Sequence, residues 1–120
     1  MGYNQILGKW GEELAIDYMI SQGYEIVASN YRAKCGEVDI VAAQGDTIVF
    51  CEVKTRTSLR YGTPASSITR EKRNHIMGVA QSFLRDGEWE DFSPRFDIIE
   101  IYRFEEIAIN HMIDAYQLED

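Results

Sequence analysis

The stretch that decides the fold runs from residue 36 to residue 54 and reads Gly36-Glu37-Val38-Asp39-Ile40-Val41-Ala42-Ala43-Gln44-Gly45-Asp46-Thr47-Ile48-Val49-Phe50-Cys51-Glu52-Val53-Lys54. It contains two mainly apolar segments of strand length, 38–43 and 48–53, which are typical of buried strands. The three residues between them, 44–46, include a glycine and predict a hairpin loop. The two strands should therefore be antiparallel neighbours.

Three charged residues interrupt these apolar segments. Counting back from the loop brings Asp39 opposite Glu52, and Glu52 and Lys54 project from the same face because side chains alternate along a strand. Two carboxylates this close repel each other unless a cation lies between them. Mg²⁺ suits oxygen ligands and commonly takes one or two carboxylates together with water and substrate phosphate. The layout is therefore typical of a metal-dependent phosphodiesterase.

The alternative interpretation of Glu52 and Lys54 is an ion pair on the surface of a strand. Glu-x-Lys is common by chance in a chain of this length, so the motif alone is weak. The residues on both sides of it are apolar and lack the polar alternation of a solvated strand, which favours a buried site.

Further segments extend this pattern through most of the chain: Gly8-Lys9-Trp10-Gly11-Glu12-Glu13-Leu14-Ala15, Gly23-Tyr24, Asn30-Tyr31-Arg32, Gly36 to Ala42, Phe50 to Arg56, and Arg95-Phe96-Asp97. With them the chain resembles the YraN-like family of uncharacterised bacterial proteins, and its first half is similar to archaeal Holliday junction resolvases. Both groups belong to the restriction-endonuclease-like superfamily. Two positions depart from the pattern, because no proline precedes Asp39 and Cys51 replaces the usual aliphatic residue. Neither touches the proposed chemistry.

The resemblance implies the nuclease core of the PD-(D/E)xK type. Asp39 and Glu52 would be metal ligands, and Lys54 would lie beside the attacking water. The resemblance also implies that Glu12 supplies a carboxylate from the opening helix. Because the junction-resolving relatives act as dimers, a homodimer is also expected here.

The opening helix gives independent support for Glu12. Its apolar residues recur at helical spacing and predict the face that packs on the sheet: Leu7, Trp10, Leu14, Ala15 and Tyr18. Glu13 lies on the opposite, polar face, whereas Glu12 shares its stripe with Gly8, Ile16 and Met19 and tilts toward the interior. The alternative is that Glu12 is a boundary residue paired with an arginine.

Length and composition limit the number of domains, the cellular location and the possible roles of the cysteines. The 120 residues are 45% hydrophobic and predict a single domain over residues 1–120. No apolar stretch approaches membrane-spanning length or is typical of a signal peptide, so we expect a cytoplasmic protein without a membrane partner. The two cysteines show no metal-binding spacing, which predicts neither zinc nor a disulfide framework.

The net charge of −8 argues against a nucleic-acid enzyme, because phosphate binding usually needs a basic surface. The basic residues are nevertheless concentrated. Residues 54–73 hold six of the twelve Lys and Arg residues, and Glu71 is their only acidic residue. Five of the six are candidates to bind nucleic acid along a stripe that leaves the site: Arg56, Arg60, Arg70, Lys72 and Arg73.

The rest of the chain is predicted to form mainly structural elements that support the site. Thr69 should cap a second helix, whose first-turn cations Lys72 and Arg73 either share a phosphate with the helix N-terminus or lie exposed in solvent. A fourth strand is expected over 95–102, a short fifth over 107–112 and a closing helical turn over 113–118. Asp97 should make a buried structural hydrogen bond rather than act in catalysis. His75 and His111 match no metal-ligand spacing.

These observations predict an α/β protein with a restriction-endonuclease-like core, in the order αβββαβ, whose mixed central sheet is flanked by helices. The predicted function is hydrolysis of phosphodiester bonds with Mg²⁺, for which Mn²⁺ should substitute. Asp39, Glu52 and the backbone carbonyl of Val53 would hold the metal, and DNA, including branched forms, is favoured over RNA as substrate. The competing hypothesis is a non-catalytic module that binds nucleic acid or a protein on the same fold.

Overall fold

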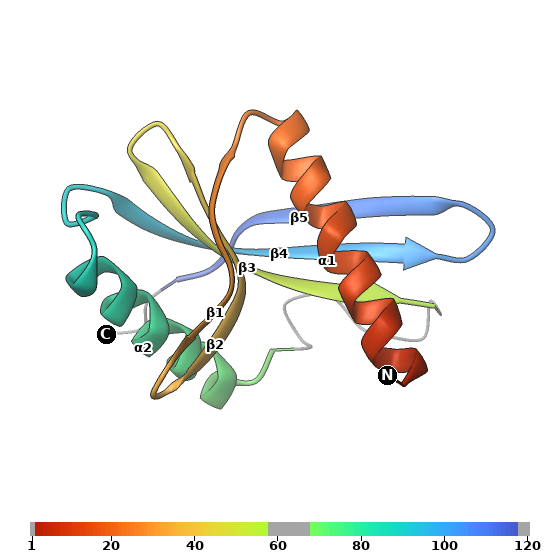
Figure 1. Cartoon of the computed structure of the whole chain (residues 1–120), viewed down its shortest axis with the longest axis horizontal. Helices are drawn as coiled ribbons and strands as arrows, with labels where there is room; N and C mark the ends of the chain where they lie inside the picture. Colours follow the sequence, from red (N-terminus) through yellow and green to blue (C-terminus); the bar gives the residue numbers. More distant parts are fainter. Residues whose placement is uncertain (1, 58–67, 118–120) are drawn as a thin grey trace.

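Two helices and five strands make up the described part of the chain, residues 2–57 and 68–117 of the computed structural model. In chain order they are α1 (Tyr3–Ser21), β1 (Glu25–Ala33), β2 (Gly36–Gln44), β3 (Thr47–Arg56), α2 (Arg70–Asp86), β4 (Ser93–Arg103) and β5 (Ile107–Tyr116) (Figure 1). The predicted α/β class and the predicted order αβββαβ are confirmed, and β5 follows this core.

The strands form one mixed sheet in the order β1-β2-β3-β4-β5. β3 and β4 are parallel, whereas the other neighbouring pairs are antiparallel. Parallel neighbours need a crossover connection, and α2 belongs to the segment that links β3 to β4. The prediction of a mixed sheet flanked by helices is therefore confirmed.

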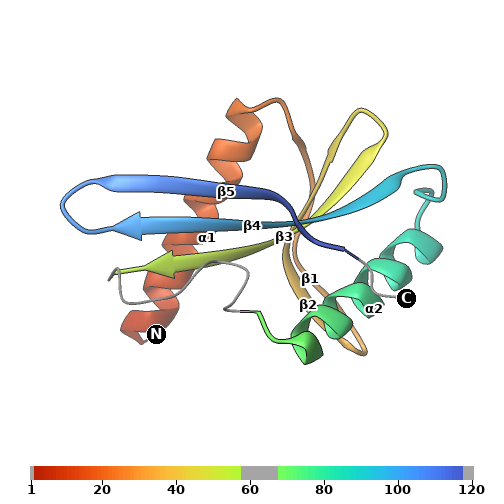
Figure 2. The ribbon, with the colours of Figure 1, turned by 180° about the vertical axis from the view of Figure 1, so that it is seen from behind.

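A separate hydrophobic core lies on each face of the sheet. α1 passes in front of the sheet in Figure 1 and behind it in Figure 2, and it packs Ala15 and Met19 onto one face. α2 packs on the other face, where Val79 joins a cluster that contains Phe50. Because side chains alternate along β3, Phe50 contributes to the α2 core and Cys51 to the α1 core.

α1 lies close to β3 at Gly11. A Cβ at this position would overlap the Thr55 hydroxyl, so any residue larger than glycine requires Thr55 or the helix to shift. The buried stripe of the helix consists of residues four apart: Gly11, Ala15 and Met19. Of the predicted apolar face only Ala15 is fully buried, and its other four members are half-buried.

α2 begins as predicted. The Thr69 hydroxyl caps the helix by accepting a hydrogen bond from the Lys72 backbone N–H at 3.1 Å. The predicted apolar face also packs inward, since Ile76, Val79, Ala80 and Phe83 are buried and Leu84 is half-buried.

Two local predictions are wrong. Gln44 pairs with Thr47, so the hairpin loop holds two residues, Gly45 and Asp46, instead of three. The predicted helical turn over 113–118 is also absent up to Gln117, because β5 continues to Tyr116. A register shift in β5 includes Asp114, whose backbone has φ 55° and whose N–H donates to the buried Asp97 carboxylate at 3.0 Å. This long-range bond stabilises an irregular strand in place of a helix.

The two helices that the structure describes lack the combination of length and apolar character needed to cross a bilayer.

Candidate active site

The candidate site lies where β2 and β3 stop pairing with each other. Their ladder runs from Gln44 and Thr47 to Ile40 and Cys51. Among the described residues, beyond that point β2 pairs only with β1, and β3 pairs only with β4. Figure 1 shows the two strands diverging there. The next residues along the two strands are Asp39 and Glu52, so the sequence-based prediction that they oppose each other is confirmed.

Where the two strands diverge, the Asp39 side chain takes the place of a backbone carbonyl as the hydrogen-bond acceptor for β3. Its carboxylate oxygen Oδ2 accepts a hydrogen bond from the Val53 backbone N–H at 2.8 Å. A buried N–H that lost its ladder partner would otherwise be unsatisfied. The bond fixes the Asp39 carboxylate against β3, on the edge of the gap between the strands.

Glu52 lies beside Asp39 and is almost fully buried, with 4% of its surface exposed. Burial, and then the Asp39 carboxylate, raise the pKa of Glu52 to about 7. The charges of Lys72 and Lys54 oppose this shift but do not cancel it. Two carboxyl groups in such proximity need a shared proton or a cation to be stable together.

Glu12 completes the acidic group from the α1 side. It is half-buried, and burial followed by the Asp39 charge raises its pKa, while a hydrogen bond with the Asn30 side chain lowers it. Glu13 is exposed. The helical-wheel argument therefore identified the carboxylate that lies next to Asp39.

Two lysines provide the positive charge, one from each side of the gap. Lys54 follows Glu52 on the same face of β3, and Lys72 comes from the first turn of α2 with its Nζ 3.5 Å from Glu52 Oε2. Burial, and then the neighbouring Lys72, lower the pKa of Lys54. Burial also lowers the pKa of Lys72, but the Glu52 charge and a hydrogen bond with Lys54 outweigh it, so the net shift is upward.

A cavity of about 350 Å³ opens onto Asp39, Glu52 and Lys72, whereas Glu12 and Lys54 are not among its lining residues. Its lining comes from the start of β2, from Glu52 and from the first two turns of α2: Gly36, Glu37, Asp39, Glu52, Thr69, Glu71, Lys72, His75 and Ile76. The volume lies within the range of small-ligand sites, about 300–1,000 Å³. The paired carboxylates and the lysine are therefore accessible to a substrate group.

The donor set suits a metal that keeps most of its water. Within residues 2–57 and 68–117, no three His, Cys, Asp or Glu side chains are arranged to hold a metal ion by themselves. Mg²⁺ commonly binds one or two carboxylates and completes its shell with water and phosphate. The crowded carboxyl groups of Asp39 and Glu52 fit this type of site, because their mutual repulsion would be relieved by a cation. A ligand role for the Val53 carbonyl stays a prediction.

The other predicted nucleic-acid-binding residues that the structure describes do not form one exposed stripe. Arg56 is buried, and its Nε donates to the buried Glu100 carboxylate at 3.2 Å. This guanidinium therefore stabilises the fold and does not lie on the surface. Arg73 lies over the Tyr116 ring, 5.5 Å from its centroid, and is half-buried. Arg70 is exposed at the start of α2. Arg60 lies outside the described residues.

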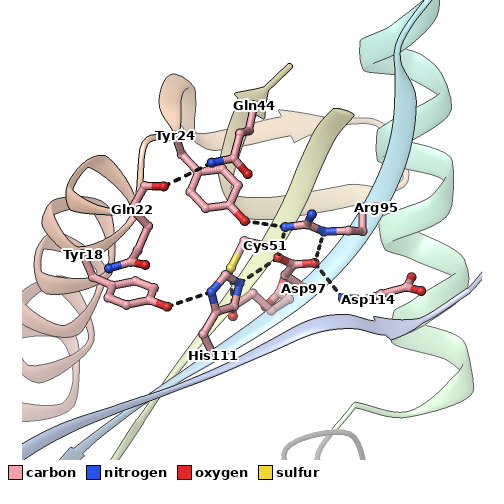
Figure 3. Close-up of polar contacts among 10 residues, drawn as sticks. Tyr18, Gln22, Tyr24, Gln44, Cys51, Arg95, Asp97, His111 and Asp114 are labelled. Carbon is pink, nitrogen blue, oxygen red and sulfur yellow. Dashed lines mark hydrogen bonds and ion pairs between the residues drawn. The ribbon is translucent and has the colours of Figure 1, made fainter. Parts of the chain in front are cut away.

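A second polar cluster, centred on Asp97, lies on the α1 side of the sheet (Figure 3). The fully buried Asp97 carboxylate binds Arg95 at 2.8 Å and His111 Nε2 at 2.7 Å, and it accepts the Asp114 N–H. His111 contacts the Tyr18 hydroxyl at 3.0 Å through its other ring nitrogen. Burial raises the pKa of Asp97, but its bonds to His111 and Arg95 outweigh this and lower the pKa overall. The predicted buried hydrogen bonding of Asp97 is confirmed, and its purely structural role stays a prediction.

Sequence reasoning missed two contributions to the site. Lys72 was expected either at a phosphate or in solvent, and its contact with Glu52 depends on how α2 packs, which no local sequence pattern indicates. No role was predicted for Asn30, whose side chain forms a hydrogen bond with Glu12 from a left-handed backbone position with φ 52°. An asparagine inside a strand is a usable signal, because asparagine tolerates this conformation better than most residues.

Comparison with known proteins gives the same family along almost the whole chain. Residues 11–101 match the family described as "Uncharacterised protein family UPF0102". A UPF0102 protein of Clostridioides difficile is 40% identical over 113 residues, covering 94% of this chain and 98% of the relative. A UPF0102 protein of Alkaliphilus oremlandii is 44% identical over 117 residues, covering 94% of this chain and 99% of the relative. A UPF0102 protein of Rhodococcus opacus is 42% identical over 118 residues, covering 97% of this chain and 100% of the relative. The chain therefore belongs to the UPF0102 family.

Proposed function

We propose that this protein is a Mg²⁺-dependent nuclease that hydrolyses phosphodiester bonds, with DNA as its favoured substrate and Mn²⁺ as a substitute metal. The observation that carries the proposal is the contact between Asp39 and Glu52, two carboxyl groups held together at the mouth of a cavity with two lysines beside them. Such an arrangement costs stability in the empty protein. It is useful where a cation and a phosphate bind together.

Asp39 and Glu52 would hold the metal. When bound, Mg²⁺ would lower the pKa of water and neutralise charge on the scissile phosphate. The hydrogen bond from Val53 N–H fixes the Asp39 carboxylate in advance, and burial in β3 fixes Glu52. Little reorganisation would then be needed when the substrate binds.

Lys54 would act on the reacting phosphate. Hydrolysis adds a water oxygen to phosphorus and breaks the bond to the leaving alcohol oxygen, so negative charge grows on the phosphoryl oxygens. The Lys54 ammonium lies on the same face of β3 as Glu52, where it can orient the attacking water and stabilise that charge. Glu12, next to Asp39, would hold surrounding water molecules or a second ion in place.

The competing function is binding without cleavage. It is favoured by the ion pair between Lys72 and Glu52, which supplies a cation to this carboxylate without any metal. A binding module would hold nucleic acid in EDTA with a steep dependence on salt. Docking of a basic protein partner onto the acidic remainder of the chain is a third possibility, in which Lys72→Glu would leave binding unchanged.

Cleavage of a labelled panel tests the proposal. The panel contains linear, single-stranded, flapped and four-way-junction DNA together with RNA, each incubated with Mg²⁺, Mn²⁺ or EDTA. Wild type should cut at least one DNA form only with metal, and Glu52→Gln and Lys54→Met should not cut it. Glu13→Gln serves as a matched surface control and should cut normally. Metal-independent binding without cleavage by wild type would replace the nuclease with the binding module.

The homodimer and the cytoplasmic location stay predictions. The mass of the protein in solution, with and without the DNA that it binds, measures the first directly.

A further inference from the structure

We propose that Lys72 serves as the cation of Glu52 while the site holds no metal, and that a divalent ion displaces it and releases its ammonium to a substrate phosphate. This inference rests on the proposed function, since it takes Asp39 and Glu52 as the metal ligands. It assigns Lys72 a positioning role that differs from simple attraction of nucleic acid.

The contact itself is asymmetric. Lys72 Nζ lies 3.5 Å from Glu52 Oε2, and the two side chains are 43% and 5% exposed. The carboxylate is fixed within the protein, whereas the ammonium reaches it from the rim. Leaving a buried carboxylate charged and unpaired is costly, so the ionised Glu52 needs a cation beside it. A lysine on a flexible four-carbon chain can leave when another cation arrives.

The backbone of Lys72 does not need to move in this exchange. Its N–H is held by the Thr69 hydroxyl in the first turn of α2. Thr69, Lys72 and Glu52 line the same cavity, together with Asp39. A released ammonium would therefore remain inside this cavity, within reach of a phosphate that enters it.

Charge explains why the exchange should be coupled to substrate. Three carboxyl groups meet two ammonium groups here: Glu12, Asp39 and Glu52 against Lys54 and Lys72. A divalent ion between Asp39 and Glu52 would repel the Lys72 ammonium. A phosphate would bind that freed ammonium, so metal and phosphate should each strengthen the binding of the other.

Metal binding without substrate tests the exchange. Mn²⁺ affinity is measured by calorimetry at pH 8 in low salt for wild type, Lys72→Met, Lys72→Gln and Arg85→Met. The two Lys72 variants should bind Mn²⁺ about tenfold more tightly than wild type, a factor typical of coupled ligands. Arg85→Met removes one positive charge about 20 Å away along the same helix and should leave the affinity unchanged. Equal or weaker binding by the folded Lys72 variants would overturn the inference.

NMR of the Lys72 side chain gives a second measurement of the exchange. In protein with ¹³C-labelled lysine, the Lys72 Cε resonance should shift during Mg²⁺ titration with the midpoint of metal binding. It should shift again when inorganic phosphate is added. The exposed Lys34 supplies the control resonance. A Lys72 signal that ignores Mg²⁺ at saturating metal would overturn the exchange.

Failure of the inference can be distinguished from failure of the proposed function. If wild type binds Mn²⁺ and Glu52→Gln loses that binding, but the Lys72 variants bind no more tightly, only the exchange is wrong. If neither wild type nor the Lys72 variants bind Mn²⁺ and no DNA is cut, both the exchange and the nuclease are wrong.

Discussion

The Asp39 carboxylate accepts the Val53 backbone N–H at 2.8 Å, at the point where β2 stops pairing with β3. One side chain therefore satisfies the backbone of the neighbouring strand and faces Glu52 at the same time. The two roles can be separated by substitution, because the first needs only an acceptor and the second needs a charge.

Asp39→Asn and Asp39→Ala should differ in stability but not in cleavage. Both remove the charge next to Glu52, and both should abolish Mn²⁺ binding and cleavage. Only Ala also removes the acceptor of the Val53 N–H, so Ala should be less stable than Asn by about 1–3 kcal/mol. Urea unfolding of both variants in EDTA measures this difference. Equal stability would show that the hydrogen bond contributes little.

The stability of the metal-free protein should depend on Glu52 ionisation. Its pKa is about 7 in the folded protein, above the ordinary value of 4.5, so the folded state binds the proton more tightly than the unfolded state. The resulting stabilisation is complete below about pH 4.5 and is lost as pH rises to about 7.

Glu52→Gln isolates this effect. The variant should lose the Glu52 part of the pH dependence and should exceed wild type in stability at pH 8 by about 1–3 kcal/mol. Unfolding free energies in EDTA from pH 4.5 to pH 8 provide the measurement. Parallel curves for the two proteins would contradict the raised pKa. Metal affinity of wild type should rise over the same pH interval, because only the ionised carboxylate binds the ion.

Glu12→Gln and its neighbour Glu13→Gln form a matched pair on one helix. Glu12 lies beside Asp39, whereas Glu13 is exposed. Loss of a group that orients metal-site ligands typically costs about 10- to 100-fold in activity or metal affinity. Glu12→Gln should therefore cut the preferred DNA more slowly by that factor, with Glu13→Gln at the wild-type rate. Equal rates for the two variants would remove Glu12 from the site.

Gly11→Ala should move α1 away from β3. A Cβ at Gly11 would overlap the Thr55 hydroxyl, and we expect a loss of about 1–3 kcal/mol in unfolding free energy. Gly8→Ala, in the same helix, meets no atom within 4 Å and should gain about 0.5–1 kcal/mol from helix propensity. Gly11→Ala combined with Thr55→Ala should recover part of the loss. Without such recovery, the overlap with Thr55 is not the cause.

Asp97→Asn should destabilise the fold without altering the chemistry. The substitution breaks a buried charge network with Arg95 and His111 and should cost about 3–5 kcal/mol. Asp114→Asn keeps a residue that tolerates the left-handed backbone and should stay within about 0.5 kcal/mol of wild type. Cleavage per folded molecule should be unchanged in both. A slower Asp97→Asn enzyme at full folding would give Asp97 a functional role.

The sequence predicted the parts of the site that depend on local geometry. The alternation of side chains along strands placed Glu52 and Lys54 on one face, and the hairpin placed Asp39 opposite Glu52, although the loop is one residue shorter than expected. Helical spacing separated Glu12 from Glu13. These relationships need only the period of a strand or helix.

The parts that could not be predicted depend on contacts between distant segments. Arg56 resembles a surface cation in sequence, yet Glu100 on β4 draws it into a buried pair. A helical turn was predicted over 113–118, but the Asp97 carboxylate accepts the Asp114 N–H, and the chain stays in β5 as far as Tyr116. Lys72 reaches Glu52 only because α2 crosses the sheet near β2. No local pattern encodes these three partners.

Because the two helices pack on opposite faces of the sheet, the site is complete only after both have docked. α1 brings Glu12 next to Asp39, and α2 brings Lys72 next to Glu52, at the gap between β2 and β3. A newly synthesised chain in which one helix has not yet docked lacks part of the charge set. For the proposed nuclease, immature or damaged copies would then be inert toward the genome, and cutting would begin only after both layers of the domain are assembled.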